Sequence, residues 1–205
     1  MKGLYLVTPD WDDTEKMLAA TEAGLRGGAA VVQYRHKTAS PALRREQAGR
    51  LQALCKRHGV PFIVNDFIDL CLELDADGIH VGGTDMAVAD VRKAVGPSRI
   101  VGASCYGSLD LARQAHQAGA SYVAFGGFYP SRVKKYEVAT RPEIVTQAKA
   151  EIPLPNVVIG GMTQENSAPL VALGADMVAV ISSVYMVEEV EAAARGFAGL
   201  FAKEG

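Results

Sequence analysis

The segment Val31–Lys37, "VVQYRHK", begins as an apolar strand and ends with three polar side chains at every second position. These are Gln33, Arg35 and Lys37. Because successive side chains of a strand point to opposite faces, a period of two places all three on the same face. The preceding residues 29–32 are continuously apolar, which is typical of a strand buried on both faces. The segment therefore predicts a buried strand whose carboxyl end opens into a polar site.

Short apolar runs of this kind recur along the whole chain. There are eight, at residues 4–8, 29–35, 61–66, 78–82, 99–105, 122–128, 156–161 and 177–183. The segments between them have helical spacing, with N-caps expected at Ser40 and Ser108 and helix ends expected at Gly59 and Gly119. Eight such units predict an α/β protein, a single (β/α)₈ TIM barrel domain over residues 1–205. The alternative is a doubly wound open sheet, which would more often carry a glycine-rich turn after its first strand.

Composition narrows the class of partner. The 205 residues include 21 Lys plus Arg against 23 Asp plus Glu, so the near-neutral charge gives no support for binding nucleic acid or an anionic membrane surface. We expect a small molecule as the partner instead. Three separated cysteines without C-x-x-C spacing argue against a disulfide framework or a structural zinc site and fit a reducing cytoplasm. The oligomeric state is left open.

The barrel prediction requires polar side chains and glycines to gather after the carboxyl ends of the strands, where such barrels build their sites. The sequence meets this requirement after strands two to eight. The residues are Gln33, Arg35, Lys37, Asn65, Asp66, His80, Asp85, Ser104, Ser131, Arg132, Lys134, Lys135, Gly160, Gly161, Ser182 and Ser183. The cations suit phosphate oxygens, and the two carboxylates suit a hard divalent metal such as Mg²⁺.

Each of these features also has a structural explanation without function. Asp66 could cap the following helix, Arg35 and Lys37 could pair with carboxylates on neighbouring loops, and the paired glycines after strand seven could form a tight turn. His80 lies inside an apolar strand, and we expect it to be a hydrogen-bonded core histidine outside catalysis. The other histidines, His36 among them, have no constellation of partners in the sequence. Position after strand seven favours phosphate binding by the glycines' backbone amides.

Eight quoted segments, in order and spacing, resemble thiamine-phosphate synthase over essentially the whole chain. They are "LYLVTPD", "VVQYRHK", "VNDF", "GIHVGGTD", "VGASCYGS", "YVAFGGFYPSRVKK", "VVIGGMT" and "GADMVAVISSVY". The resemblance implies a (β/α)₈ barrel that joins hydroxymethylpyrimidine diphosphate to hydroxyethylthiazole phosphate and releases diphosphate with Mg²⁺. The chain is expected to be a transferase of thiamine biosynthesis.

The resemblance also implies roles for individual residues. Gln33 would contact the pyrimidine, and the diphosphate would be held by Arg35, Lys37, Asn65, Ser104 and Lys134. Asp66 and Asp85 would bind Mg²⁺. The thiazole phosphate would meet Gly161 and the backbone at Ile181 and Ser182, and Ser131 matches one hydroxyl position of the loop after strand six.

Two positions depart from the family's pattern. Gly83 replaces the usual Gln of the "GQ-x-D" pattern after strand four, and Val133 replaces the second hydroxyl of a "T-x-T-K" pattern. Loss of one phosphate contact would cost about 1 kcal/mol, or somewhat more for a contact to a charged group. Two other hypotheses therefore stay open: a thiazole tautomerase working without metal, whose relatives lack the Asn-Asp pair, and a non-catalytic barrel that binds a phosphate ligand.

Overall fold

The computed structural model describes residues 1–82, 87–130 and 140–202, in which eight parallel strands close into a barrel in sequence order. The strands are β1 (Gly3–Val7), β2 (Ala29–Tyr34), β3 (Phe62–Asn65), β4 (Gly78–Val81), β5 (Ile100–Ser104), β6 (Tyr122–Gly126), β7 (Asn156–Ile159) and β8 (Met177–Val180). Strand β1 pairs with both β2 and β8, which completes the closure. The predicted (β/α)₈ fold is confirmed.

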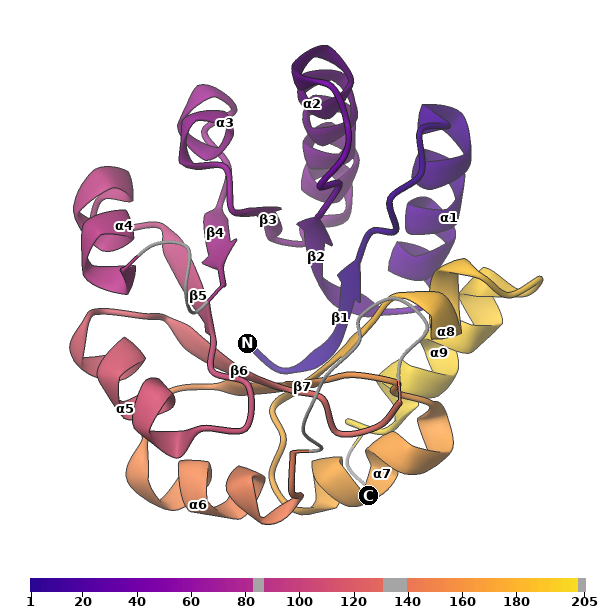
Figure 1. Ribbon diagram of the computed structural model, residues 1–205. Coiled ribbons are helices and arrows are strands. Elements are labelled where there is room, and N and C mark those ends of the chain that lie inside the picture. The colour runs from indigo at the N-terminus through magenta and orange to yellow at the C-terminus, as the bar shows by residue number, and fades with distance from the viewer. Residues whose placement is uncertain (83–86, 131–139, 203–205) are drawn as a thin grey trace.

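Helices alternate with the strands and form a ring outside them (Figure 1). They are α1 (Thr14–Arg26), α2 (Pro41–His58), α3 (Ile68–Glu73), α4 (Val88–Val95), α5 (Leu109–Gln117), α6 (Glu143–Glu151), α7 (Gln164–Ala172), α8 (Ser182–Tyr185) and α9 (Val190–Gly199). None of the helices in the described part of the chain is long and apolar enough to cross a membrane.

Local sequence explains where the second and fifth helices begin and end. The Ser40 side chain accepts a hydrogen bond from the backbone N–H of Leu43 at 3.2 Å, and Ser108 caps α5 in the same way. Helix α2 ends at Gly59, whose φ of 66° lies in the left-handed region that glycine adopts without strain. The caps predicted at Ser40, Ser108 and Gly59 are confirmed, whereas the C-cap of α5 is Ala118, one residue before the predicted Gly119.

The apolar core forms two layers. An outer layer lies between the strands and the helices, and an inner layer fills the barrel below its mouth. The inner layer contains Tyr5, Val7, Val31, Ile63, Tyr122, Ala124, Val157, Met177, Ala179 and Ile181. Polar residues at the next inward-facing positions therefore point into the barrel mouth, because inward-facing residues recur every second position along a strand.

Candidate active site

A cavity of about 360 Å³ opens at the carboxyl ends of the strands. Its apolar lining consists of Val7, Ala124, Val157, Ile159 and Ala179, and its polar lining consists of Tyr5, Gln33, Arg35, Lys37, Asn65, Asp66, His80, Ser104, Tyr106 and Tyr122. Gly82 and Gly126 complete it. A pocket of this size, with an apolar base and convergent polar groups, suits a small polar ligand.

Six of the predicted site residues come together around this cavity: Gln33, Arg35, Lys37, Asn65, Asp66 and Ser104. They come from β2, β3, β5 and the loops that follow them. Gly161, Ile181 and Ser182 are described but are not part of its lining. Asp85, Ser131 and Lys134 lie outside the described residues, as do Gly83 and Val133.

The backbone of Arg35 is held by Thr8, the residue after β1. The Thr8 hydroxyl accepts a hydrogen bond from the Arg35 backbone N–H at 2.8 Å and donates to the Arg35 carbonyl at 3.1 Å. Thr8 is fully buried. Thr8 thus fixes the backbone position of Arg35 directly after β2.

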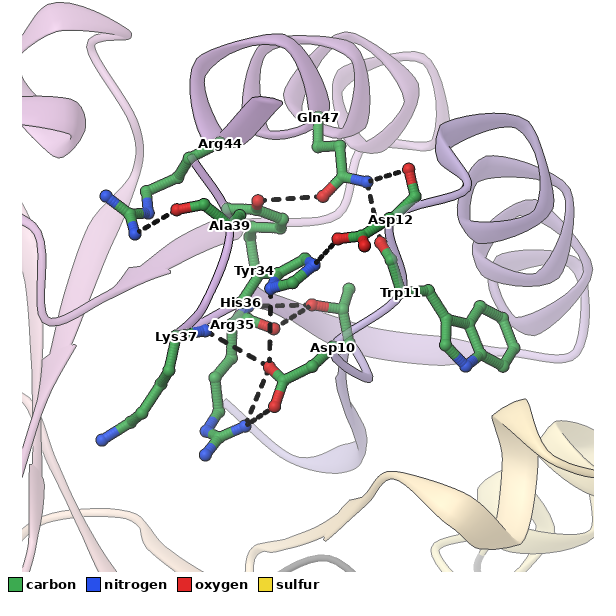
Figure 2. Close-up of polar contacts among 11 residues, drawn as sticks. Asp10, Trp11, Asp12, Tyr34, Arg35, His36, Lys37, Ala39, Arg44 and Gln47 are labelled. Carbon is green, nitrogen blue, oxygen red and sulfur yellow. Dashed lines mark hydrogen bonds and ion pairs between the residues drawn. The ribbon is translucent and has the colours of Figure 1, made fainter. Parts of the chain in front are cut away.

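Both cations of "VVQYRHK" have carboxylate partners (Figure 2 shows that of Arg35). Arg35 Nη1 donates to both carboxylate oxygens of Asp10, at 3.2 and 3.3 Å, and Lys37 Nζ lies 3.5 Å from Asp66 Oδ2. Among the described residues, however, the buried Nε of Arg35 has no hydrogen-bond partner. An unpaired buried donor is costly, and this one belongs to a side chain that lines the cavity.

His36 corrects the expectation that it has no constellation of partners. Its side chain is almost completely buried, with Nε2 at 3.0 Å from Asp12 Oδ1 and Nδ1 at 3.9 Å from Asp10 Oδ1 (Figure 2). Spacing could not reveal this cluster, because its acidic partners come from the loop after β1. His36 thus links that loop to the end of β2.

Asp66 does not cap the next helix. The N-cap of α3 is Phe67, which makes no side-chain capping bond, and the Asp66 carboxylate instead accepts a hydrogen bond from Asn65 Nδ2 at 2.7 Å. Asp66 also has a φ of 64°, an uncommon backbone conformation for a residue other than glycine. Strained backbone of this kind clusters at functional sites. The capping explanation of Asp66 is therefore wrong.

A continuous series of hydrogen bonds crosses the barrel below the mouth. Gln33 Nε2 donates to the Tyr5 hydroxyl at 2.8 Å, and the hydroxyls of Tyr5 and Tyr122 lie 2.7 Å apart. The imidazole of His80 then joins the Tyr122 hydroxyl, 2.8 Å from Nδ1, to Ser104 Oγ, 2.9 Å from Nε2. The prediction that His80 is hydrogen-bonded is confirmed, but this residue also lines the cavity. Tyr5 and Tyr122 were missed, although inward alternation with Val7 and Ala124 is the signal that could have found them.

The glycines after β7 pack against the loop after β6. Gly160 and Gly161 have φ of 114° and 61°, and a Cβ on Gly161 would lie 2.3 Å from the carbonyl oxygen of Pro130. The Ser183 hydroxyl donates to the carbonyl of Met162, so the start of α8 lies beside this turn. These contacts support the tight-turn explanation and require glycine at both positions.

Comparisons of sequence and of structure with known proteins identify the family that the sequence motifs resemble. The family model described as thiamine monophosphate synthase matches residues 4–184. Thiamine-phosphate synthase of Janthinobacterium sp. (strain Marseille) is 66% identical over 203 residues, covering 99% of this chain and 98% of the relative. The enzyme of the same name from Thiobacillus denitrificans is 48% identical over 202 residues, covering 98% of this chain and 96% of the relative.

Solved structures are similar to this chain over nearly its whole length. Thiamine phosphate pyrophosphorylase from Pyrococcus furiosus superposes with a TM-score of 0.86 at 29% identity, covering 97% of this chain and 94% of that one. A 3-hexulose-6-phosphate synthase superposes with a TM-score of 0.71 at 19% identity, covering 98% and 100%, which shows the shared barrel fold alone. From the full-length match in sequence and structure, the chain belongs to the thiamine monophosphate synthase family.

Proposed function

We propose that the chain catalyses the reaction of its family, joining hydroxymethylpyrimidine diphosphate to hydroxyethylthiazole phosphate. The bond between the exocyclic methylene carbon and the diphosphate oxygen breaks, and its electron pair leaves with the diphosphate. The lone pair of the thiazole nitrogen then forms the new carbon–nitrogen bond, which gives thiamine phosphate. The observation that carries the assignment is the convergence of six matched residues on one cavity in a chain of this family.

The cations support departure of the diphosphate. Diphosphate is a good leaving group when its growing negative charge is neutralised. Arg35 and Lys37 both line the cavity, so their cationic side chains suit the diphosphate oxygens. Lys134 would add a third cation. The aminopyrimidine ring stabilises positive charge on the methylene, so cleavage runs ahead of bond formation and no protein nucleophile is required.

Asp66 fits a role in holding Mg²⁺. Its carboxylate lines the cavity and is fixed by Asn65, and a carboxylate pair with phosphate oxygens and water is the ligand set that Mg²⁺ prefers. Within the described residues, which do not include Asp85, no group of three or more His, Cys, Asp or Glu side chains is placed to hold a metal. When bound by Asp66 and Asp85, Mg²⁺ would neutralise charge on the departing diphosphate.

The two substrates would meet over the apolar base of the cavity. Gln33 would contact the pyrimidine, while Asn65 and Ser104 would add hydrogen bonds to the diphosphate. Gly161, with the backbone at Ile181 and Ser182, would receive the thiazole phosphate, and Ser131 matches one hydroxyl position of the family's pattern. Holding both partners together supplies much of the remaining acceleration. Asn65 and Asp66 favour this reaction over a thiazole tautomerase, whose relatives lack that pair.

The metal assignment is tested with Asp66→Ala and a matched control, Asp69→Ala. Asp69 is exposed in the first turn of α3, three residues away and outside the cavity. We expect Asp66→Ala to lose Mg²⁺-dependent turnover and to lose the Mg²⁺ dependence of diphosphate binding by calorimetry, with Asp69→Ala unchanged. Full activity of Asp66→Ala would refute the assignment.

The proposal also includes the cellular compartment and the molecules that the protein binds. The three cysteines are buried free thiols, which supports a reducing cytoplasm. We propose small phosphorylated molecules as the partners, with no role for nucleic acid or membrane. That residues 1–205 form a single domain stays a prediction.

A further inference from the structure

The hydrogen-bonded series from Gln33 to Ser104 has a direction. Gln33 Nε2 is the atom that faces Tyr5, so the Tyr5 oxygen is an acceptor there and its own proton is free for Tyr122. Tyr122 then donates to Nδ1 of His80, which leaves the proton of the neutral imidazole on Nε2, facing Ser104 Oγ. Each hydroxyl and the ring N–H from Tyr5 to His80 then has an acceptor.

The opposite direction fails at Tyr5. If Tyr122 donated to Tyr5, the Tyr5 oxygen would accept from both Tyr122 and Gln33, and its own proton would need a third partner. Among the described residues, Gln33 and Tyr122 are the hydrogen-bond partners of the Tyr5 hydroxyl, which lies on a side chain 1% exposed. A buried hydroxyl without an acceptor is costly, so the direction from Gln33 to Ser104 is favoured.

Packing fixes the rings that carry this series. A Cβ on Gly102 would lie 2.0 Å from Tyr122 Cζ, so the phenol of Tyr122 occupies the space that a side chain at position 102 would need. The Tyr122 and His80 rings lie 20° from parallel, with their centroids 5.6 Å apart. Burial raises the pKa of both Tyr5 and Tyr122, so both phenols keep their protons as donors at neutral pH.

We propose that Tyr122 and His80 are positioning residues that turn the Ser104 hydroxyl proton toward the cavity. Ser104 Oγ accepts from His80 Nε2–H, and its own hydrogen donates to an oxygen of the substrate's diphosphate group. The same series holds the Gln33 amide with Oε1 free to accept from the amino group of the pyrimidine ring. The identity of these ligand groups rests on the proposed function, whereas the direction of the series belongs to the free protein.

The direction is measured without substrate. In protein labelled with ¹⁵N-histidine, long-range ¹H–¹⁵N NMR distinguishes the two imidazole tautomers, and the His80→Gln variant identifies the His80 signals. We expect the Nε2–H tautomer, with Nδ1 shifted by an accepted hydrogen bond that Tyr122→Phe abolishes. An Nδ1–H tautomer, or an Nδ1 signal that Tyr122→Phe leaves unchanged, would overturn the proposal even in an active enzyme.

A double-mutant cycle tests the consequence for the reaction. Tyr122→Phe should lower kcat/KM about tenfold, the effect of one lost orienting hydrogen bond. In a Ser104→Ala background the same change should cost less than about twofold, because the group that it orients is gone. Equal losses in both backgrounds would show that Tyr122 does not act through Ser104.

A matched control removes a buried hydroxyl elsewhere. The Tyr34 hydroxyl donates to Gln47 Oε1 at 3.0 Å between β2 and α2, outside the cavity lining. Tyr34→Phe should leave the His80 signals and kcat/KM unchanged. If the wild-type protein has no turnover, the cycle is measured on inorganic diphosphate affinity by calorimetry, so failure of the proposed function and failure of this inference remain distinguishable.

Discussion

Thr8 provides a sharp test of how the site is built, because Thr8→Val removes its hydroxyl while keeping nearly the same shape. Two hydrogen bonds to the Arg35 backbone would be lost, from the N–H at 2.8 Å and to the carbonyl at 3.1 Å. At about 1 kcal/mol for each bond, unfolding free energy should fall by about 2 kcal/mol. For a chain of this length that corresponds to a decrease in Tm of roughly 4–8 °C.

The same substitution should weaken the site, because it releases the backbone from which the Arg35 side chain extends. We expect KM for the pyrimidine diphosphate to rise about tenfold, equivalent to about 1.4 kcal/mol, with a smaller change in KM for the thiazole phosphate. Urea unfolding and steady-state kinetics measure the two effects. Thr146→Val is the control, since its exposed hydroxyl donates within α6. Lower stability with an unchanged KM would refute the claim that Thr8 positions Arg35.

Three other outcomes follow from particular contacts. Gly102→Ala should lower the free energy of unfolding by roughly 1–3 kcal/mol, because the new methyl group would overpack against Tyr122. Gly199→Ala is the control and should be neutral by urea unfolding, because a Cβ there would meet nothing within 4 Å. Equal effects of the two substitutions would contradict the packing explanation. Burial raises the pKa of Tyr5, Tyr34, Tyr122 and Tyr185. Their contribution to stability is therefore full below pH 10 and is lost as the pH rises further. Absorbance at 295 nm tests this: it would be refuted if more than three of the seven tyrosines were ionised in the folded protein at about pH 11. Lys37→Met should raise KM for the diphosphate substrate about tenfold and make this KM less dependent on salt concentration. Exposed Lys56→Met is the control and should leave both quantities unchanged. A KM with the same salt dependence in Lys37→Met as in the wild type would count against Lys37 as a diphosphate ligand.

Much of the barrel was predictable from periodicity. All eight apolar runs contain strands, because a strand buried on both faces has a continuous apolar sequence bounded by turn residues. The caps at Ser40 and Ser108 were predictable because they depend on local hydrogen bonds. The family and its transferase function were recognised from motifs and are confirmed by the comparisons.

The support of the site was less predictable. Gln33 and Arg35 follow the inward face of β2, so alternation could place them, but the partners Asp10 and Thr8 come from a different strand and its loop. His36 was missed for the same reason, since its contact with Asp12 depends on how two loops fold together. Tyr122 lies within an apolar run of the sequence, and its hydroxyl joins a polar series with Tyr5 and His80 because closure of the barrel brings these side chains together.

The central claim is a Mg²⁺-dependent transfer of the pyrimidine methylene from diphosphate to the thiazole nitrogen. The most direct measurement is formation of thiamine phosphate and diphosphate from the two substrates, with Mg²⁺ and with chelator. We predict stoichiometric amounts of both products with Mg²⁺ and none with chelator. Equal product in the presence of chelator would contradict the metal assignment, and no product from folded protein that binds both substrates would contradict the proposed reaction itself.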